Sequence, residues 1–198
     1  MNAHTPLPSI VKLPRFVALC GNPKSGKSEV QKILDSLYGY EPVDDGHVLR
    51  QFAVEKLGLS WDDVQTQDGK AQFTEILGKN WQNRDILGTL GKQLEDMFGE
   101  HIMPFIATRQ LPNAGRYSFG SVRKTQGHFF KDAGGVVIEI ENPAAPPSPY
   151  AFDKFDGSVV DYVITNNALA LGLPVEEARA DLRAKVITVM NYIAEVGL

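Results

Sequence analysis

Residues 16–28, with the sequence FVALCGNPKSGKS, decide the fold. The first five, Phe16–Cys20, form an unbroken apolar run of the kind found in strands buried on both faces of a parallel sheet. The next eight fit the phosphate-binding pattern G-x-x-x-x-G-K-[ST] in full. They are Gly21, Asn22, Pro23, Lys24, Ser25, Gly26, Lys27 and Ser28. Because a helical pattern follows, this stretch predicts a P-loop that binds the phosphates of ATP.

Each residue type in the loop has a physical role. Gly21 and Gly26 allow backbone conformations that a Cβ atom would hinder. The N–H groups of the loop and of the following helix then face the phosphates. Lys27 is expected to reach the β- and γ-phosphates, and Ser28 is expected to ligate Mg²⁺. The sequence therefore predicts ATP and Mg²⁺ as cofactors.

Strand and helix patterns alternate on the C-terminal side of the loop. Apolar residues at helical spacing predict a helix over residues 29–38, and Gly39 ends it. Further strands are expected at residues 40–43, 117–122, 136–140 and 159–164, and a final helix at residues 174–196. This alternation predicts an α/β protein, with a three-layer αβα P-loop kinase fold and a mostly parallel sheet.

The domain organisation follows from the same patterns. Residues 1–14 are expected to form a flexible leader, and residues 15–198 a single P-loop kinase domain. Within this domain, residues 59–103 have mostly helical patterns, which predict a helical insertion. We expect this insertion to bind the acceptor. Residues 142–157 are rich in proline and are expected to form a lid-like loop.

Composition limits the partners. The net charge is −4 and no basic run occurs, which argues against a duplex nucleic acid and leaves small-molecule nucleotides as the expected partners. No apolar run approaches the ~20 residues of a membrane span. The single cysteine, Cys20, suits a reducing compartment. We therefore expect a cytoplasmic protein, in the host cytoplasm if a phage encodes it. The oligomeric state is left open, with a homodimer as one option.

Three arginines are candidates for holding phosphate groups. Arg123 follows the C-terminal end of a predicted strand, where α/β sheets bind their ligands. Its planar guanidinium suits a bridge between donor and acceptor phosphates. Arg84 is the next candidate, as a clamp for the acceptor phosphate, and Arg109 is a third. Lys27, Arg123 and Arg84 are thus the predicted catalytic residues.

Two carboxylates follow the second predicted strand. Asp44 and Asp45 are expected to lie beside the P-loop and the substrate, although Asp-Asp-Gly also favours a simple turn. A carboxylate at this place can hold Mg²⁺ through water, and Asp45 is the metal candidate. It can also bind a sugar hydroxyl or act as a general base. A phosphate acceptor needs no base, since it is already ionised near pH 7, whereas a hydroxyl acceptor benefits from one.

Residues 15–171 resemble the phage deoxynucleoside monophosphate kinases, within the P-loop nucleotide-kinase group. Beyond the P-loop, the matches come in the family's order. They are Arg84 with Leu87 and Leu90-Gly91, then Ser121-Val122-Arg123, then residues 134–140 (GGVVIEI), and then residues 161–167 (DYVITNN). The resemblance implies transfer of the γ-phosphoryl group of ATP to a (deoxy)nucleoside monophosphate, giving the diphosphate and ADP. It also implies that Asn166 and Asn167 lie beside the ATP base.

Two other functions remain open. The first is a P-loop kinase that phosphorylates a hydroxyl acceptor such as a modified nucleobase, for which Asp44 or Asp45 would serve as the base. The second is a catalytically weak nucleotide-binding relative. Ser121 favours this second alternative, because the resembling kinases have an aspartate there, near Mg²⁺. A GTPase switch is disfavoured, because no Asn-Lys-x-Asp follows a late strand.

Overall fold

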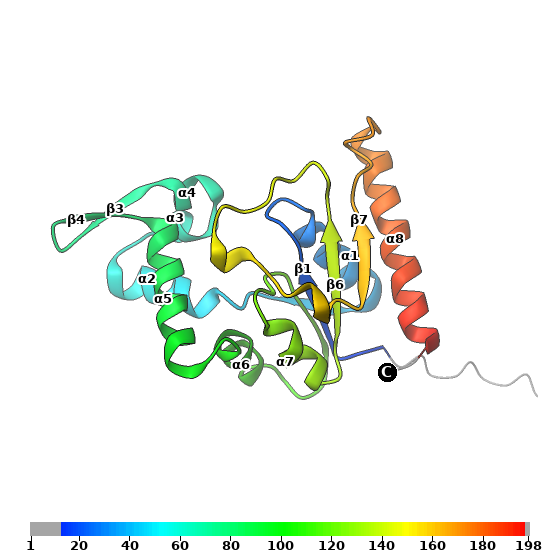
Figure 1. Cartoon of the computed structure of the whole chain (residues 1–198), viewed down its shortest axis with the longest axis horizontal. Coiled ribbons are helices and arrows are strands. Elements are labelled where there is room, and N and C mark those ends of the chain that lie inside the picture. Colours follow the sequence, from blue (N-terminus) through cyan, green and yellow to red (C-terminus); the bar gives the residue numbers. More distant parts are fainter. Residues whose placement is uncertain (1–12, 197–198) are drawn as a thin grey trace, which may run out of the picture.

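The computed structural model of the chain describes residues 13–196 (Figure 1). The predicted leader at residues 1–14 therefore lies outside the described residues, except for Leu13 and Pro14. Pro14 is buried, and its carbonyl oxygen accepts a hydrogen bond of 2.6 Å from the hydroxyl of Tyr40. Leu13 packs against the main core. These two residues thus belong to the folded domain.

A five-stranded parallel sheet forms the centre of the molecule. Its order is β2 (Tyr40–Val43), β5 (Arg116–Phe119), β1 (Phe16–Cys20), β6 (Val136–Glu141) and β7 (Tyr162–Thr165). All five residues of β1 are buried, as expected for a central strand covered on both faces. The P-loop therefore starts from the middle of the sheet, at the carboxyl end of β1.

Helices cover both faces of the sheet. On one face, α1 (Lys27–Tyr38) and α8 (Val175–Val196) pack against Val17, Leu19 and Ile138 in the larger core cluster. On the other face, α7 (Gln126–Asp132) contributes Phe130 to a second cluster with Phe16 and Phe119. This arrangement confirms the predicted α/β fold with helices on both sides of a parallel sheet.

The insertion expected at residues 59–103 lies within a longer stretch between β2 and β5, and this whole stretch is called the insertion from here on. Its elements are α2 (His47–Leu57), α3 (Trp61–Gln65), α4 (Gln67–Ala71), β3 (Phe73–Ile76), β4 (Lys79–Gln82), α5 (Asn83–Phe98) and α6 (Ile102–Arg109). A small core of its own, built around Ala53, Leu59, Val64 and Ile86, holds the first helices to α5. Ser60 and Asp63 form a capping box at the start of α3.

The insertion also contains a hairpin that the helical patterns did not predict. Strands β3 and β4 pair in antiparallel fashion and project away from the central sheet (Figure 1). Leu77 and Gly78 join them, both with positive φ (52° and 73°), which is the geometry of a two-residue hairpin turn. The residues of β3 alternate between exposed and half-buried, but their sequence, FTEI, does not alternate apolar and polar residues, so no strand pattern marked the hairpin.

The proline-rich segment, residues 142–157, runs between α5 and the sheet (Figure 1). It contains the short 3₁₀ helix η1 (Ala151–Asp153), and a second one, η2 (Gly157–Val159), follows it. The expected strand at residues 159–164 begins only at Tyr162, because Asp156 caps η2 by accepting a hydrogen bond from Ser158 N. Within residues 13–196, no helix combines the length and apolar character that crossing a membrane requires.

Candidate active site

The P-loop connects the carboxyl end of β1 to the first turn of α1 through a backbone that requires glycine. Gly21 has φ 129° and Gly26 has φ 109°. A Cβ atom on Gly21 would lie 2.3 Å from the carbonyl oxygen of Ile140, and one on Gly26 would lie 2.4 Å from Nδ2 of Asn166. Both positions therefore exclude a side chain on conformational and steric grounds. Lys24, at φ 65°, completes the turn of the loop.

Lys27 closes over the loop that it follows. Its Nζ donates hydrogen bonds to the carbonyl oxygens of Gly21, at 2.7 Å, and Asn22, at 2.8 Å. Burial lowers the pKa of Lys27, and the nearby carboxylate of Asp153 opposes this effect. The ammonium group is thus held at the P-loop by two carbonyl oxygens, and its charge is only partly balanced by the Asp153 carboxylate.

Three polar side chains lie in or beside the P-loop: Asn166 and Asn167, which follow β7, and Ser25 of the loop itself. Nδ2 of Asn166 donates a hydrogen bond of 2.9 Å to the carbonyl oxygen of Ser25. The adjacent Asn167 accepts a contact of 3.4 Å from Lys185 Nζ through Oδ1. Asn166 therefore braces the P-loop from the end of β7, and its contact with the ATP base stays a prediction. The fully buried hydroxyl of Ser25 finds no hydrogen-bond partner within residues 13–196.

A pocket of about 320 Å³ separates the P-loop from the insertion. One wall is the loop itself, through Lys27, Ser28 and their neighbours. The opposite wall comes from the insertion and from the loop after β5. The lining residues are Gly21, Pro23, Lys27, Ser28, Arg50, Gln65, Gln67, Lys70, Arg84, Gly120, Ser121, Val122, Arg123 and Asp153. We call this cavity the phosphate pocket.

Four basic side chains line the phosphate pocket opposite the P-loop: Arg50 of α2, Lys70 of α4, Arg84 of α5, and Arg123 after β5. Arg50 Nε donates to the carbonyl oxygen of Val64 at 3.2 Å, and the Arg50 guanidinium pairs with Asp44. Arg84 donates to Gln67 Oε1 at 2.6 Å and lies over the ring of Tyr150, 5.2 Å from its centre. Four separate segments thus bring their positive charges to one place.

Lys70 shows how positive this wall is. Burial, followed by the charges of Arg50 and Arg84, lowers the pKa of Lys70 to about 8. Its ammonium group makes no hydrogen bond or ion pair with any other residue of the described part of the chain. A half-buried cation beside three guanidinium groups favours a bound anion. The sequence patterns missed Arg50 and Lys70, because neither residue belongs to a motif.

Two aspartates lie close to Arg123. Asp153, from η1 of the proline-rich segment, lines the phosphate pocket and has Oδ1 3.6 Å from Arg123 Nε. Asp45 is buried, and burial raises its pKa to about 6, although the charge of Arg123 and the nearby Ser121 hydroxyl oppose this rise. Asp45 does not line the phosphate pocket, so its expected role as a metal residue stays a prediction. Sequence reasoning did not single out Asp153.

Arg109 lies apart from these residues. It is exposed at the end of α6, with its guanidinium over the ring of Phe105, 5.6 Å from the ring centre. It does not line the phosphate pocket. The structure therefore brings Arg84 and Arg123 together as expected, but places the third candidate arginine elsewhere.

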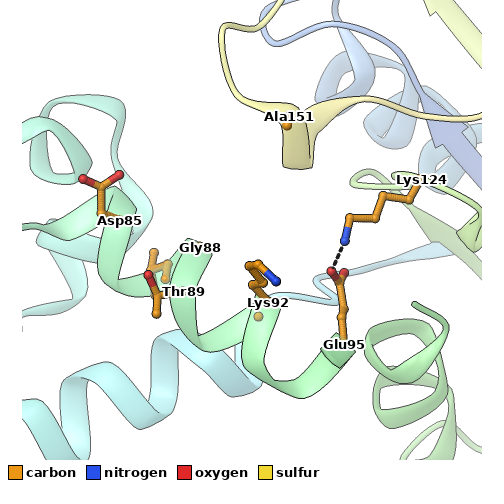
Figure 2. A pocket seen from close by; sticks show the side chains of 9 residues that line it. Asp85, Gly88, Thr89, Lys92, Glu95, Lys124 and Ala151 are labelled. Carbon is orange, nitrogen blue, oxygen red and sulfur yellow. Dashed lines mark hydrogen bonds and ion pairs between the residues drawn. The ribbon is translucent and has the colours of Figure 1, made fainter. Parts of the chain in front are cut away.

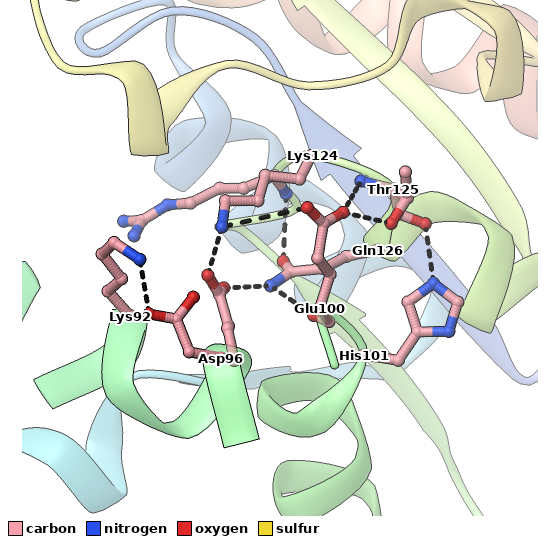
Figure 3. Close-up of polar contacts among 9 residues, drawn as sticks. Lys92, Asp96, Glu100, His101, Lys124, Thr125 and Gln126 are labelled. Carbon is pink, nitrogen blue, oxygen red and sulfur yellow. Dashed lines mark hydrogen bonds and ion pairs between the residues drawn. The ribbon is translucent and has the colours of Figure 1, made fainter. Parts of the chain in front are cut away.

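Glu100, Lys124 and Gln126 belong to a polar network (Figure 3), which also fixes the backbone at Arg123. The buried Gln126 accepts a hydrogen bond from Arg123 N at 3.1 Å and donates to the carbonyl oxygen of Glu100 at 3.3 Å. Lys124 pairs with Glu95 at the end of α5. Because Arg84 lies at the start of the same helix, α5 connects the two arginines of the phosphate pocket.

A second pocket of about 380 Å³ runs along α5 (Figure 2). It is lined by Asp85, Leu87, Gly88, Thr89, Gly91, Lys92, Glu95, Lys124 and Ala151. Leu87 and Gly88 also line a smaller pocket that contains Arg84 and Arg123. The cavity along α5 therefore adjoins the phosphate pocket, and it offers room for the remainder of a ligand whose phosphate lies on the arginines.

The side chains in the phosphate pocket fit a magnesium ion. The Ser28 hydroxyl and the Asp153 carboxylate line the same cavity, and both are hard oxygen donors of the type that Mg²⁺ prefers. Residues 13–196 contain no cluster of three or more histidine, cysteine or acidic side chains placed to hold a metal. Protein-bound Mg²⁺ commonly rests on one or two carboxylates and the phosphates of its substrate, which this donor set allows.

Comparisons with known proteins give distant likenesses only. No protein-family model matches the chain, and no curated protein sequence matches it significantly. Among solved structures, a gluconokinase from Sinorhizobium meliloti 1021 is 10% identical, with a TM-score of 0.41 over 94% of this chain and 99% of that one. A dephospho-CoA kinase from Campylobacter jejuni is 15% identical, with a TM-score of 0.44 over 91% of this chain and 98% of that one. Likenesses at this level do not bear on the substrate.

Proposed function

We propose that this chain is an ATP-dependent kinase that phosphorylates a (deoxy)nucleoside monophosphate. The observation that carries the proposal is the phosphate pocket, with a P-loop on one wall and four cations on the other. Transfer between two phosphate-bearing molecules needs two sets of anion contacts that face each other. A hydroxyl acceptor without a phosphate group gives no reason for the second set.

The donor side is built from the P-loop. Backbone N–H groups of the loop and the first turn of α1 are suited to the phosphates of ATP. Lys27 would exchange its hydrogen bonds with Gly21 and Asn22 for phosphate oxygens. Ser28 and Asp153 would hold Mg²⁺, which supplies charge neutralisation for the transferring phosphoryl group when it is bound.

The acceptor side is built from the insertion. Arg50, Lys70 and Arg84 would hold the acceptor phosphate, and the pocket along α5 would take its nucleoside. Arg123 lines the phosphate pocket and the smaller pocket that shares Leu87 and Gly88 with the cavity along α5. Its backbone is fixed by Gln126, so its guanidinium is suited to the phosphoryl group in transfer. The attacking group is a phosphate oxygen that is ionised near pH 7, so this reaction requires no general base.

The test is a panel of acceptors with ATP and Mg²⁺, read as ADP release and as the mass of the product. The panel contains the common ribo- and deoxyribonucleoside monophosphates, the matching nucleosides, and DNA with hydroxymethylated bases. The proposal expects turnover with at least one monophosphate and none with its nucleoside. Turnover with nucleosides or modified DNA, and with no monophosphate, would refute it.

One observation favours a second candidate, a kinase with a hydroxyl acceptor. Asp45 is buried next to the phosphate pocket, and its pKa of about 6 places it within the range useful for a general base. The variant Asp45→Asn separates the two candidates. Loss of most of the turnover would favour the hydroxyl acceptor, whereas a monophosphate kinase retains its activity in this variant.

A further inference from the structure

The proline-rich segment places a carboxylate in the phosphate pocket. The side chain of Asp153 is only 10% exposed, and it lines the cavity together with Lys27 and Ser28. Its Oδ1 lies 3.6 Å from Arg123 Nε. The carboxylate also acts on Lys27, whose pKa it raises against the effect of burial. A pocket suited to the several negative charges of a nucleotide therefore contains a negative charge of its own.

Several contacts hold Asp153 in this position. Ser148 Oγ donates a hydrogen bond of 2.6 Å to Asp153 Oδ2. Two backbone hydrogen bonds join the segment to Lys124, one from Lys124 N to Lys154 O at 2.6 Å and one from Asp156 N to Lys124 O at 2.8 Å. The segment is thus fastened next to Arg123. The Asp153 carboxylate is therefore a fixed part of the lining of the phosphate pocket.

This carboxylate affects different anions to different degrees. Two negative groups within a few ångströms repel each other strongly where water is largely excluded. Metal-free ATP presents its full phosphate charge to Asp153. A nucleotide that carries Mg²⁺ presents less charge, and its metal adds an attraction to the carboxylate. The carboxylate therefore weakens the binding of metal-free nucleotide more than that of the magnesium complex.

We propose that Asp153 is a specificity-determining residue, which makes the phosphate pocket select magnesium-bound nucleotide over metal-free nucleotide. The inference rests on the proposed function, because it takes ATP as the ligand of the P-loop. It adds that a residue of the lid-like segment, far from the P-loop in sequence, decides which form of ATP the loop accepts.

The test is isothermal titration calorimetry with the non-hydrolysable analogue AMP-PNP, once in EDTA and once in excess Mg²⁺, and without an acceptor. The variant is Asp153→Asn, which removes the charge but keeps an oxygen for the Ser148 hydroxyl. The matched control is Asp156→Asn, with the same charge change on the same segment. Asp156 does not line the phosphate pocket, and asparagine also caps a helical turn well.

We expect Asp153→Asn to bind metal-free AMP-PNP on the order of tenfold more tightly than the wild type, because one repulsive charge is removed. Its affinity for the magnesium complex stays the same or falls, so the preference for Mg²⁺ shrinks. Asp156→Asn keeps the wild-type preference. An unchanged or weaker metal-free affinity in Asp153→Asn would overturn the inference, as would an equal gain for both forms.

The same experiment distinguishes this inference from the proposed function. If the wild type binds AMP-PNP with a strong preference for Mg²⁺ but phosphorylates no monophosphate, only the proposed acceptor is refuted. A wild type that binds the analogue in neither condition overturns the P-loop assignment and this inference together.

Discussion

The two walls of the phosphate pocket are built in different ways. The P-loop wall is one continuous stretch between β1 and α1, with glycines at the two positions where a Cβ atom would collide with the protein. The opposite wall gathers Arg50, Lys70, Arg84 and Arg123 from four segments spread over more than 70 residues. The first wall can be seen in the sequence, whereas the second exists only after folding.

The two walls should differ in how much activity the protein loses on a single substitution. Nearly every contact of the P-loop wall depends on local backbone geometry, and Lys27 supplies its one side-chain cation apart from the exposed Lys24. The opposite wall has four cations, namely Lys70 and the three arginines whose charges act on it, Arg50, Arg84 and Arg123. A single substitution should therefore be more damaging in the first wall than in the second.

The largest effect is expected for Lys27→Ala. Loss of this ammonium group removes the charge at the β- and γ-phosphates, and we expect kcat to fall on the order of 10³-fold. The fold should survive, since Lys27 bonds only to carbonyl oxygens of its own loop. Steady-state kinetics and circular dichroism check the two halves of this prediction. Unchanged turnover in a folded variant would show that the loop is not the donor site.

The next effect is expected for Arg123→Ala. An arginine aimed at the transferring phosphoryl group acts mainly in the transition state, so we expect kcat to fall on the order of 10²-fold while ATP affinity changes little. Arg123→Lys should rescue poorly, because it keeps the charge but loses the planar fork. If Arg123→Ala keeps the wild-type kcat, Arg123 does not act on the transferring phosphoryl group and serves only as a partner of Asp153.

A smaller effect is expected from the titration of Lys70. Its pKa of about 8 lies below the ordinary value, so the group loses its proton, and with it the attraction for an anion, as the pH rises through about 8. We expect KM for the acceptor to rise several-fold, up to about tenfold, between pH 7 and pH 9. Arg at this position stays charged in that range. A Lys70→Arg variant with the same pH profile would exclude Lys70 as the cause.

A further effect concerns the stability of the fold rather than turnover, at the border between the walls. The pKa of Asp45 is raised from 3.8 to about 6 in the folded protein, so this group favours folding most at low pH and loses that contribution as the pH rises toward 6. Asp45→Asn should be more stable than the wild type at pH 7, on the order of 2 kcal/mol. Urea denaturation at pH 5 and pH 7 measures this difference. Equal stabilities of the wild type and Asp45→Asn at pH 7 would show that burying the Asp45 carboxylate does not lower the free energy of unfolding.

The sequence was sufficient for the central sheet and the P-loop, because both depend on neighbours in the chain. The run FVALC and the pattern that follows it predicted β1, the loop and α1 to within two residues. Arg123 was found through its place at the end of a predicted strand, and Arg84 through the family resemblance. Arg50, Lys70 and Asp153 were not, because their partners lie in other elements and only tertiary packing brings them together.

The hairpin β3–β4 and the role of Asn166 show a similar limit. The hairpin consists of two four-residue strands joined by Leu77 and Gly78, too short to stand out within a helical region. The expected contact of Asn166 with the ATP base stays a prediction, but the hydrogen bond from its amide to the carbonyl oxygen of Ser25 was not foreseen. Helix and strand patterns report which face of an element is apolar, and they do not report which distant backbone group a polar side chain will meet.

The central claim is that the two walls bind two different phosphate-bearing molecules, and Arg84→Ala tests it most directly. Steady-state KM values for ATP and for the monophosphate acceptor are measured in this variant, with Arg109→Ala as the control, since Arg109 does not line the phosphate pocket. The account predicts that Arg84→Ala raises the acceptor KM by about 10- to 100-fold, as expected for one lost charge-assisted contact, and leaves the KM for ATP within about twofold. Arg109→Ala should change neither. An equal rise in both KM values, or a rise for ATP alone, would contradict the division of the pocket into a donor wall and an acceptor wall.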